Sequence, residues 1–432
     1  MEGTKNFAWP VTAVSKEDFD VVRSCVASSG NLFRDKKIMI FGAGIRGSLI
    51  SVILEAEGFT NILFTDNNPD KWGGCIDNHP IVPPEAAISM RGETVIVIST
   101  EEGDPIKAQL EKAGLVEGVD FLFPKTDLYD KFAGEFERKA ENGILAMGDC
   151  MFEVVSFHDV NKQSLAEMIF ERLGNENIKL LTMHGMGMRS FYHILKAQSA
   201  MGMRPGIFVV MINFETLTDK QHLLPRSQHS KLMRRLSDIV KGVDGGELSE
   251  YACITEQRVK NVQAEFFTTN KQKSAPYTNS TGDISIKAAR LFFKLHYMYK
   301  LDPNTENLEY LAKVFEFAQA EGFHVIPFVP PVNYELGESL FGEAFQAAYR
   351  RNFKIVDDLT KKYNCDLLDL SHLCTKELFS GSFTPDETTN CEGRQKIADK
   401  ITREIERVRN GCIKREQIGF GDIERNTRLR RC

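Results

Sequence analysis

The sequence predicts a two-domain α/β protein in which each domain is built on a parallel β-sheet. The chain has 432 residues, which is too long for one compact core. Short apolar runs alternate with segments of helical period through both halves of the chain, and this alternation is typical of parallel βαβ units. No internal repeat interrupts the pattern, so we expect two successive domains.

The first predicted domain covers residues 1–126. A helix over residues 16–35 leads into it, and a charged helix over residues 127–142 connects it to the rest of the chain. Between these two helices, apolar strands alternate with helices, as a parallel sheet requires. The predicted strands are residues 37–41, 61–65, 94–99 and 120–123, and the predicted helices are residues 45–56 and 106–113.

The second predicted domain covers residues 143–410 and is followed by a basic tail over residues 411–432. Five parallel strands flanked by helices predict a flavodoxin-like, three-layer α/β/α sheet, whose ligands bind outside the carboxyl ends of the strands. Residues 216–300 are too long for a plain loop, so we expect a helical insertion or lid there. The predicted strands are residues 144–147, 178–183, 207–212, 324–329 and 366–370.

Composition and charge exclude several classes of protein. The net charge of −6 is acidic overall, which argues against a nucleic-acid binder. The chain has no apolar run of the ~20 residues that a membrane helix needs and no signal peptide, so we expect a cytoplasmic location without stable membrane insertion. The nine cysteines include no CxxC pair, so neither a metal site nor a disulfide framework is expected.

A glycine-rich turn, GAGIRG over residues 42–47, follows the first strand and opens a helix. Gly42 permits the tight turn, Gly44 lets a phosphate approach the backbone, and Gly47 lets the helix pack closely. The helix N-terminus adds N–H donors and positive potential. Asp66 ends the next strand, where a ribose-binding acid belongs. These four residues predict a nucleotide site, and a glycine turn without a ligand is the alternative.

Two further runs follow that turn: DNNPDKWG at residues 66–73 and HPIVPPE at residues 79–85. With them, residues 36–125 resemble the small Rossmann-like domains attached to bacterial enzymes of capsule and surface-polysaccharide synthesis. The resemblance implies a nucleotide, a nucleotide sugar or an NAD-type ligand and does not choose among them. No hydride-transfer partner is evident, so a dehydrogenase is not expected.

Chemically useful residues follow every strand of the second predicted sheet. The first strand runs into Asp149 and Cys150, and a thiol at the start of a helix would favour the thiolate. The second strand leads to Gly185 and Gly187, whose backbone N–H groups could face an oxyanion. The third ends at Asn213, whose amide could be another oxyanion donor. The last two strands end in PPVN at residues 330–333 and DLSH at residues 369–372.

These strand ends carry a second resemblance, over residues 143–408. The segment GDC at 148–150 stands where the SGNH/GDSL hydrolase superfamily usually has Gly-Asp-Ser. Gly185 or Gly187 matches its oxyanion glycine, Asn213 matches its asparagine, and FVPPVN at 328–333 is also similar. The resemblance includes the acyltransferase-like members that act in cell-envelope synthesis, and it implies their fold and an acyl-transfer or hydrolytic site.

The last block of this superfamily departs from the pattern here. It usually reads Asp-x-x-His before an Asn and a Gly that opens the final helix. Thr388, Asn390 and Gly393 match that register, so Thr388 stands at the histidine position. Pro385 stands at the acid position, with Asp386 one place along. The usual nucleophile–base–acid triad is therefore incomplete.

A replacement base is needed if Cys150 is a nucleophile. His184 is the preferred candidate, because it ends the strand predicted to lie beside that of Cys150, and a Cys–His pair needs no third member. His372 at the fifth strand end is the second choice. His222 and His229 on the insertion are further candidates that a closing lid would deliver.

Three functions remain open at this point. The first is an acyl transferase or esterase that acts through Cys150 on a nucleotide-linked sugar or surface-glycan precursor. The second is a catalytically degenerate module that binds glycan or scaffolds a complex, which Thr388 favours. The third is another group transfer in which Asp149, Asp386 and arginines such as Arg189 handle a charged donor. The expected partner is a small-molecule or glycan substrate, and homo-oligomerisation is left open.

Overall fold

A computed structural model describes residues 13–76, 78–100, 103–126, 128–139, 143–156, 159–174, 177–218, 229–270, 286–380 and 388–428. The chain divides into two compact units. The first comprises Met1–Leu128, Glu153–Lys162 and Thr269–Phe292. The second comprises Tyr129–Phe152, Gln163–Thr268 and Phe293–Cys432.

The first unit contains a six-stranded sheet in the order β4-β5-β3-β2-β6-β7, in which only the β4–β5 pair is antiparallel. The central strand β2 is the predicted KIMIF run. The β4–β5 hairpin was not predicted, and β7 is shorter than expected. The strands are β2 (Lys37–Phe41), β3 (Ile62–Thr65), β4 (Cys75–Ile76), β5 (His79–Val82), β6 (Thr94–Ile98) and β7 (Phe121–Leu122).

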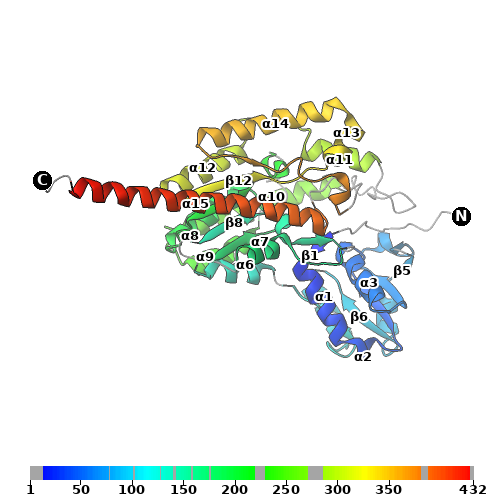
Figure 1. Cartoon of the computed structure of the whole chain (residues 1–432). Coiled ribbons are helices and arrows are strands. Elements are labelled where there is room, and N and C mark those ends of the chain that lie inside the picture. Colours follow the sequence, from blue (N-terminus) through cyan, green and yellow to red (C-terminus); the bar gives the residue numbers. More distant parts are fainter. Residues whose placement is uncertain are drawn as a thin grey trace. The chain divides into compact units, whose positions relative to one another are not determined.

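Helices cover both faces of this sheet (Figure 1). Alternate residues of β2 point to opposite faces, so Ile38 packs in one apolar cluster and Met39 in the other. Both clusters are buried, and the strand is accordingly apolar at every position after Lys37. The helices are α1 (Lys16–Ser28), α2 (Gly30–Phe33), α3 (Ile45–Ala56), η1 (Pro69–Lys71), α4 (Pro84–Ser89) and α5 (Asp104–Lys112).

The second unit contains a five-stranded sheet, parallel throughout, in the order β10-β8-β11-β12-β13. In chain order this is 2-1-3-4-5, the flavodoxin-like arrangement, so the predicted fold class is confirmed. The strands are β8 (Ile144–Gly148), β10 (Ile178–Thr182), β11 (Ile207–Met211), β12 (His324–Val329) and β13 (Leu368–Asp369).

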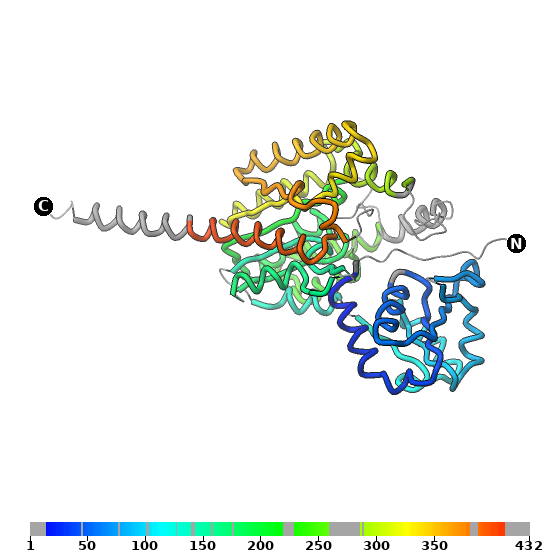
Figure 2. Tube along the Cα trace, turned by 45° about the vertical axis from the view of Figure 1, so that its right-hand side comes forward, coloured from blue at the N-terminus to red at the C-terminus, as the bar shows by residue number. Residues whose placement is uncertain are grey.

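Two pairs of helices make the outer layers. The helices α7 (Leu165–Arg172) and α15 (Cys391–Arg428) pack together over the face that includes Ile144 and Phe328, and Figure 2 shows the coloured part of α15 beside the green tube of α7. The right-handed crossover rule places α8 (Met188–Ala200) and α12 (Glu306–Ala320) on the opposite face, where they pack against each other.

The predicted insertion is helical where the structure describes it. It contains α9 (Ser230–Val240), α10 (Glu247–Asn270) and α11 (Ile286–His296). No helix within the described residues is long and apolar enough to cross a membrane. The remaining elements are β1 (Ala13–Ser15), α6 (Leu128–Glu137), η2 (Cys150–Phe152), β9 (Val154–Ser156), η3 (Phe214–Leu217), α13 (Tyr334–Phe341), α14 (Glu343–Lys362) and η6 (Lys376–Leu378).

Candidate functional sites

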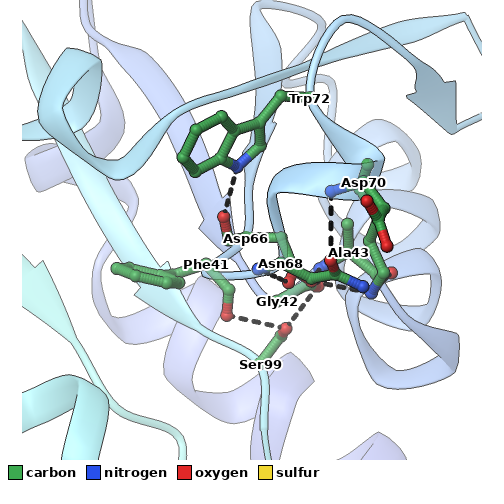
Figure 3. A network of polar contacts seen from close by, with 9 residues as sticks. Phe41, Gly42, Ala43, Asp66, Asn68, Asp70, Trp72 and Ser99 are labelled. Atoms are coloured by element: carbon green, nitrogen blue, oxygen red, sulfur yellow. Dashed lines mark hydrogen bonds and ion pairs between the residues drawn. The ribbon is translucent and has the colours of Figure 1, made fainter.

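The glycine-rich turn of the first unit has the backbone that its sequence predicts (Figure 3). Gly42 has a φ of +117°, a left-handed conformation that disfavours any side chain. A Cβ at Gly42 would lie 2.4 Å from the Ser99 hydroxyl oxygen. That hydroxyl lies 2.9 and 2.8 Å from the carbonyl oxygens of Phe41 and Gly42 and donates to this pair. Ser99 thus fixes the turn from the end of β6.

The other two glycines differ in what surrounds them. A Cβ at Gly47 would lie 2.2 Å from the carbonyl oxygen of Gly42, so only glycine lets α3 pack this closely on the turn. A Cβ at Gly44 would meet nothing within 4 Å. Gly44 is also the residue that precedes α3, and none of the described side chains caps it there. The open space therefore lies at the helix start, where the sequence predicts a phosphate.

Asp66 ties the loop after β3 to the glycine turn. Its Oδ2 accepts from the backbone N–H of Ala43 and from Nζ of Lys71, both at 2.8 Å, and its Oδ1 accepts from the Asn68 N–H at 2.8 Å. The Trp72 indole also donates to the Asp66 carbonyl at 2.7 Å. A carboxylate offers about four acceptor positions. One position is left for a ribose hydroxyl, and the predicted ribose contact stays a prediction.

Arg46, within the turn motif, is a structural residue that the motif did not predict. Its Nε lies 3.2 Å from Oδ1 of Asp18 in α1. Its Nη2 donates to the Pro124 carbonyl and, at 3.0 Å, to the Thr126 hydroxyl. The guanidinium therefore joins α1 and the end of the first unit, while its buried Nη1 has no hydrogen-bond partner among the described residues.

In the second unit, Asp149 connects the ends of two strands. It is buried, with 6% of its surface exposed. Its Oδ1 accepts from the Met151 N–H, and its Oδ2 accepts from the Asn213 side-chain amide, both at 2.9 Å. Burial raises the pKa of Asp149, and these two hydrogen bonds oppose the rise. The carboxyl group thus links the end of β8 to the end of β11.

Asn213 is engaged on both sides of its amide. One amide hydrogen goes to Asp149, and the amide oxygen accepts from the Glu215 N–H at 2.9 Å, which caps η3. The residue is 2% exposed. Asn213 thus holds Asp149 and caps η3, and the predicted oxyanion contact stays a prediction.

Cys150 follows Asp149 and is half-buried, with its sulfur as a thiol. The predicted helix at this point is wrong. Cys150 starts only the single turn η2, and the chain then enters β9, which pairs with β1. Phe152 ends that turn with its ring against Gly148, where a Cβ would lie 2.5 Å away. Because one turn has little dipole, η2 gives a thiolate at Cys150 little stabilisation.

His184 lies in the turn that follows β10, and Cys150 lies in the turn that follows β8. β10 pairs with β8 in parallel, with Thr182 opposite Gly148, and His184 and Cys150 each lie two positions beyond the end of their strand. The His184 side chain is exposed. Gly185 follows with a φ of +71°, and Gly187 directly precedes α8. The register thus brings these predicted site residues to one edge of the sheet, and their catalytic roles stay predictions.

The last block of the site has a structural role in the described residues. Thr388 is half-buried, and its carbonyl accepts from the Ser380 N–H at 2.9 Å. The Asn390 side chain accepts from the Gly393 N–H at 3.0 Å as α15 begins. A Cβ at Gly393 would lie 2.6 Å from Cβ of Thr389. The predicted register of Asn390 and Gly393 at the helix start is therefore present, without a histidine at position 388.

The other histidines and acids predicted for the site are either described at other positions or lie outside the described residues. His372 is exposed, with its ring centre 4.1 Å from that of Tyr334. His229 precedes α9. Asp386, Pro385 and His222 lie outside the described residues.

Two residues at the same sheet edge were not predicted as site residues. Asn333 and Ser371 are fully buried after β12 and β13. Asn333 caps α13 through its amide oxygen, 3.2 Å from the Leu336 N–H. Its Nδ2 and the Ser371 hydroxyl have no hydrogen-bond partner among the described residues. Buried polar atoms of this kind need a water or a ligand. The sequence signal that could have identified them is the position of PPVN and DLSH directly after predicted strands.

Comparison with known proteins gives a distant structural likeness only. No family model matches the sequence, and a search of curated proteins finds no match. Two solved structures are similar: a catalytic mutant of Axe2, an acetylxylan esterase from Geobacillus stearothermophilus, at 8% identity, and an Axe2 mutant described as an acetyl-xylooligosaccharide esterase, at 9%. Each match has a TM-score of 0.32 and covers 62% of this chain and 96% of the other. The fold assignment therefore rests on the strand order.

Proposed function

We propose that the second unit is an SGNH-type acyl, or related group, transferase or esterase that acts through Cys150. One observation carries the proposal. The thiol directly follows Asp149, which Asn213 anchors between β8 and β11, and His184 follows the end of β10, the strand that pairs with β8. A thiol, an imidazole and glycine N–H groups after the carboxyl ends of two paired strands support the proposal, because flavodoxin-like sheets bind ligands at that edge.

The chemistry follows the usual two-step route of a Cys–His pair. His184 takes the thiol proton, and the Cys150 sulfur forms a bond to the acyl carbon. The carbonyl π electrons move to oxygen, where the N–H groups near Gly185 and Gly187 stabilise the charge. Collapse breaks the bond to the leaving oxygen, which receives the proton from His184. An acceptor hydroxyl or water then gives its proton to His184 and attacks the thioester, and the thiol is regenerated.

The substrate in this proposal is a nucleotide-linked sugar or a surface-glycan precursor. The glycine turn with open space at Gly44 supports a nucleotide ligand for the first unit. NAD(H) and UDP-, CDP- and GDP-sugars at millimolar concentration should be compared by thermal shift. A bound ligand raises the melting temperature by mass action, and no shift with any of them would contradict the nucleotide part.

The catalytic part is tested with p-nitrophenyl acetate as a generic acyl donor. After an acid quench, mass spectrometry should find one acetyl group on the peptide that contains Cys150. Cys150→Ala should abolish this adduct, whereas Cys253→Ala, at an exposed cysteine, should leave it unchanged. An adduct that is absent from Cys150, or equally frequent on Cys253, contradicts covalent catalysis.

A second candidate is the degenerate binding module, favoured by Thr388 at the histidine position. Its backbone is engaged with Ser380, so the block has a structural use without catalysis. This candidate predicts ligand binding that is unchanged in Cys150→Ala, together with no acyl adduct in the wild-type protein.

A further inference from the structure

We propose that Arg189 and Arg258 form a binding subsite for a phosphate group beside the candidate active edge. This inference rests on the proposed function and adds to it: the substrate would carry a phosphate group that this subsite binds. Arg189 is the second residue of α8 and follows Gly187 by two positions. Gly187 in turn lies next to Thr216, whose hydroxyl donates to the Asn213 carbonyl at 2.7 Å.

The Arg189 guanidinium is buried but lacks acceptors. Only 6% of the residue is exposed, and neither Nε nor Nη1 has a hydrogen-bond partner among the described residues. The group is held over the Tyr251 ring, with its central carbon 4.7 Å from the ring centre. The Tyr251 hydroxyl is fixed in turn, 3.1 Å from the Ser190 hydroxyl. A rigidly placed cation with unused donors is suited to an anionic ligand.

Arg258 in α10 contributes the second guanidinium. Its Nη1 is also buried without a partner among the described residues. The described ion pairs of both arginines end on Oε1 of Glu306, 3.8 Å from Nε of Arg189 and 3.4 Å from Nη2 of Arg258. The longer distance exceeds that of a hydrogen bond. Two positive charges thus share one carboxylate, and Glu306 occupies the place of a ligand oxygen.

The charges of Lys196 and Lys313 act on the pKa of His193, the neighbour of this cluster, in the same direction as that of Arg189, and the charge of Asp244 acts against them. The His193 ring stacks on Tyr251, with 4.2 Å between ring centres. The pKa of His193 is lowered to about 4, mainly by burial and then by the charges of Arg189, Lys196 and Lys313. Glu306 is also the first residue of α12, so the first turns of α8 and α12 meet here, and each helix start favours an anion.

A ligand can reach the cluster from the side of Glu306. The side chains of Glu306 and Arg258 are each 33% exposed, whereas that of Arg189 is 8% exposed. Displacement of the Glu306 carboxylate would open both guanidinium forks to one tetrahedral group. Two forks with helix N–H donors suit phosphate, which has several acceptor oxygens.

The test is calorimetric binding of inorganic pyrophosphate to the full chain, with chloride at equal ionic strength as the reference. The protein carries Gly44→Ala and Cys150→Ala in every measurement. The first substitution weakens binding at the glycine turn, and the second removes the candidate nucleophile. Arg258→Gln should weaken binding about tenfold or more, because a charge-assisted bond is lost. Glu306→Gln should tighten binding several-fold, because it removes the internal competitor. Arg204→Gln is the matched control, since Arg204 pairs with Glu321 at 3.2 Å and should leave binding unchanged.

Two outcomes overturn the subsite: Glu306→Gln that weakens or does not change binding, or Arg258→Gln that binds like the control. Arg258 and Glu306 are partly exposed, so these variants test the subsite even if Arg189→Gln fails to fold. Anion binding without an acyl adduct on wild-type Cys150 would support the subsite and contradict the proposed catalysis. An adduct without anion binding would do the reverse.

Discussion

Lys179 shows how strongly a single residue can be constrained in this fold. The residue lies in β10 and is 1% exposed. Its Nζ donates to the Phe136 carbonyl at 2.8 Å and to Oε1 of Gln198 at 2.6 Å, so one ammonium group joins α6, β10 and α8. Burial lowers its pKa from 10.5 to about 8, against an opposing contribution from Glu135.

The lowered pKa predicts a pH-dependent stability. Between pH 8 and 10.5 the unfolded chain keeps the Lys179 proton that the folded chain has lost, so the contribution of Lys179 to the free energy of unfolding rises with pH. Urea unfolding of the wild type and Lys179→Met at pH 7.5 and pH 10 isolates this contribution. The wild type should gain stability relative to the variant at the higher pH, and a pH-independent difference would contradict the assignment.

The glycine turn allows a second residue-scale prediction. Gly47→Ala should lower the free energy of unfolding by about 1–3 kcal/mol, because its Cβ would clash with the Gly42 carbonyl. Gly44→Ala is the matched control and should fold normally, because its Cβ enters open space, yet it should weaken nucleotide binding. Thermal unfolding checks both variants. Equal stability of the two would mean that α3 does not pack on the turn as described.

At the scale of elements, local patterns predicted the strands well and the connection after β8 poorly. The strands β2 and β12 have the predicted bounds, because their apolar runs are buried on both faces. The turn at Cys150 was predicted as a helix, but β9 pairs with the distant β1. α7 begins only at the capping box of Ser164 and Glu167. A pairing between segments so far apart leaves no local signal.

The link between β8 and β11 makes an element-scale prediction. Asn213→Ala should lower the free energy of unfolding by about 1–3 kcal/mol, because it removes a buried partner of the Asp149 carboxyl. Asn304→Ala is the control, because that exposed amide makes a similar bond, 3.2 Å from Oδ1 of Asp302, and should change stability by at most about 0.5 kcal/mol. Denaturant titration measures both. An equally small effect at Asn213 would show that the link is not structural.

At the scale of the whole molecule, the sequence predicted the two α/β folds and the strand ends that carry the candidate site. It could not predict the partners of those residues. Asp66 bonds to Ala43 and Lys71, and Asn213 bonds to Asp149. Sequence patterns do not predict such contacts, because they depend on side-chain geometry across loops. The buried, acceptor-poor state of Arg189 likewise arises only when α8, α10 and α12 meet.

The central claim is that Cys150 is a nucleophile assisted by His184, and the rate of iodoacetamide labelling at neutral pH tests it most directly. Mass spectrometry should find Cys150 labelled faster than the average thiol of the unfolded chain, although the residue is half-buried. His184→Ala should slow labelling of Cys150 and leave that of the exposed Cys253 unchanged, because His184 follows the strand that pairs with β8, whereas Cys253 lies in α10. A Cys150 that labels no faster than the unfolded-chain average, with or without His184, would contradict the account.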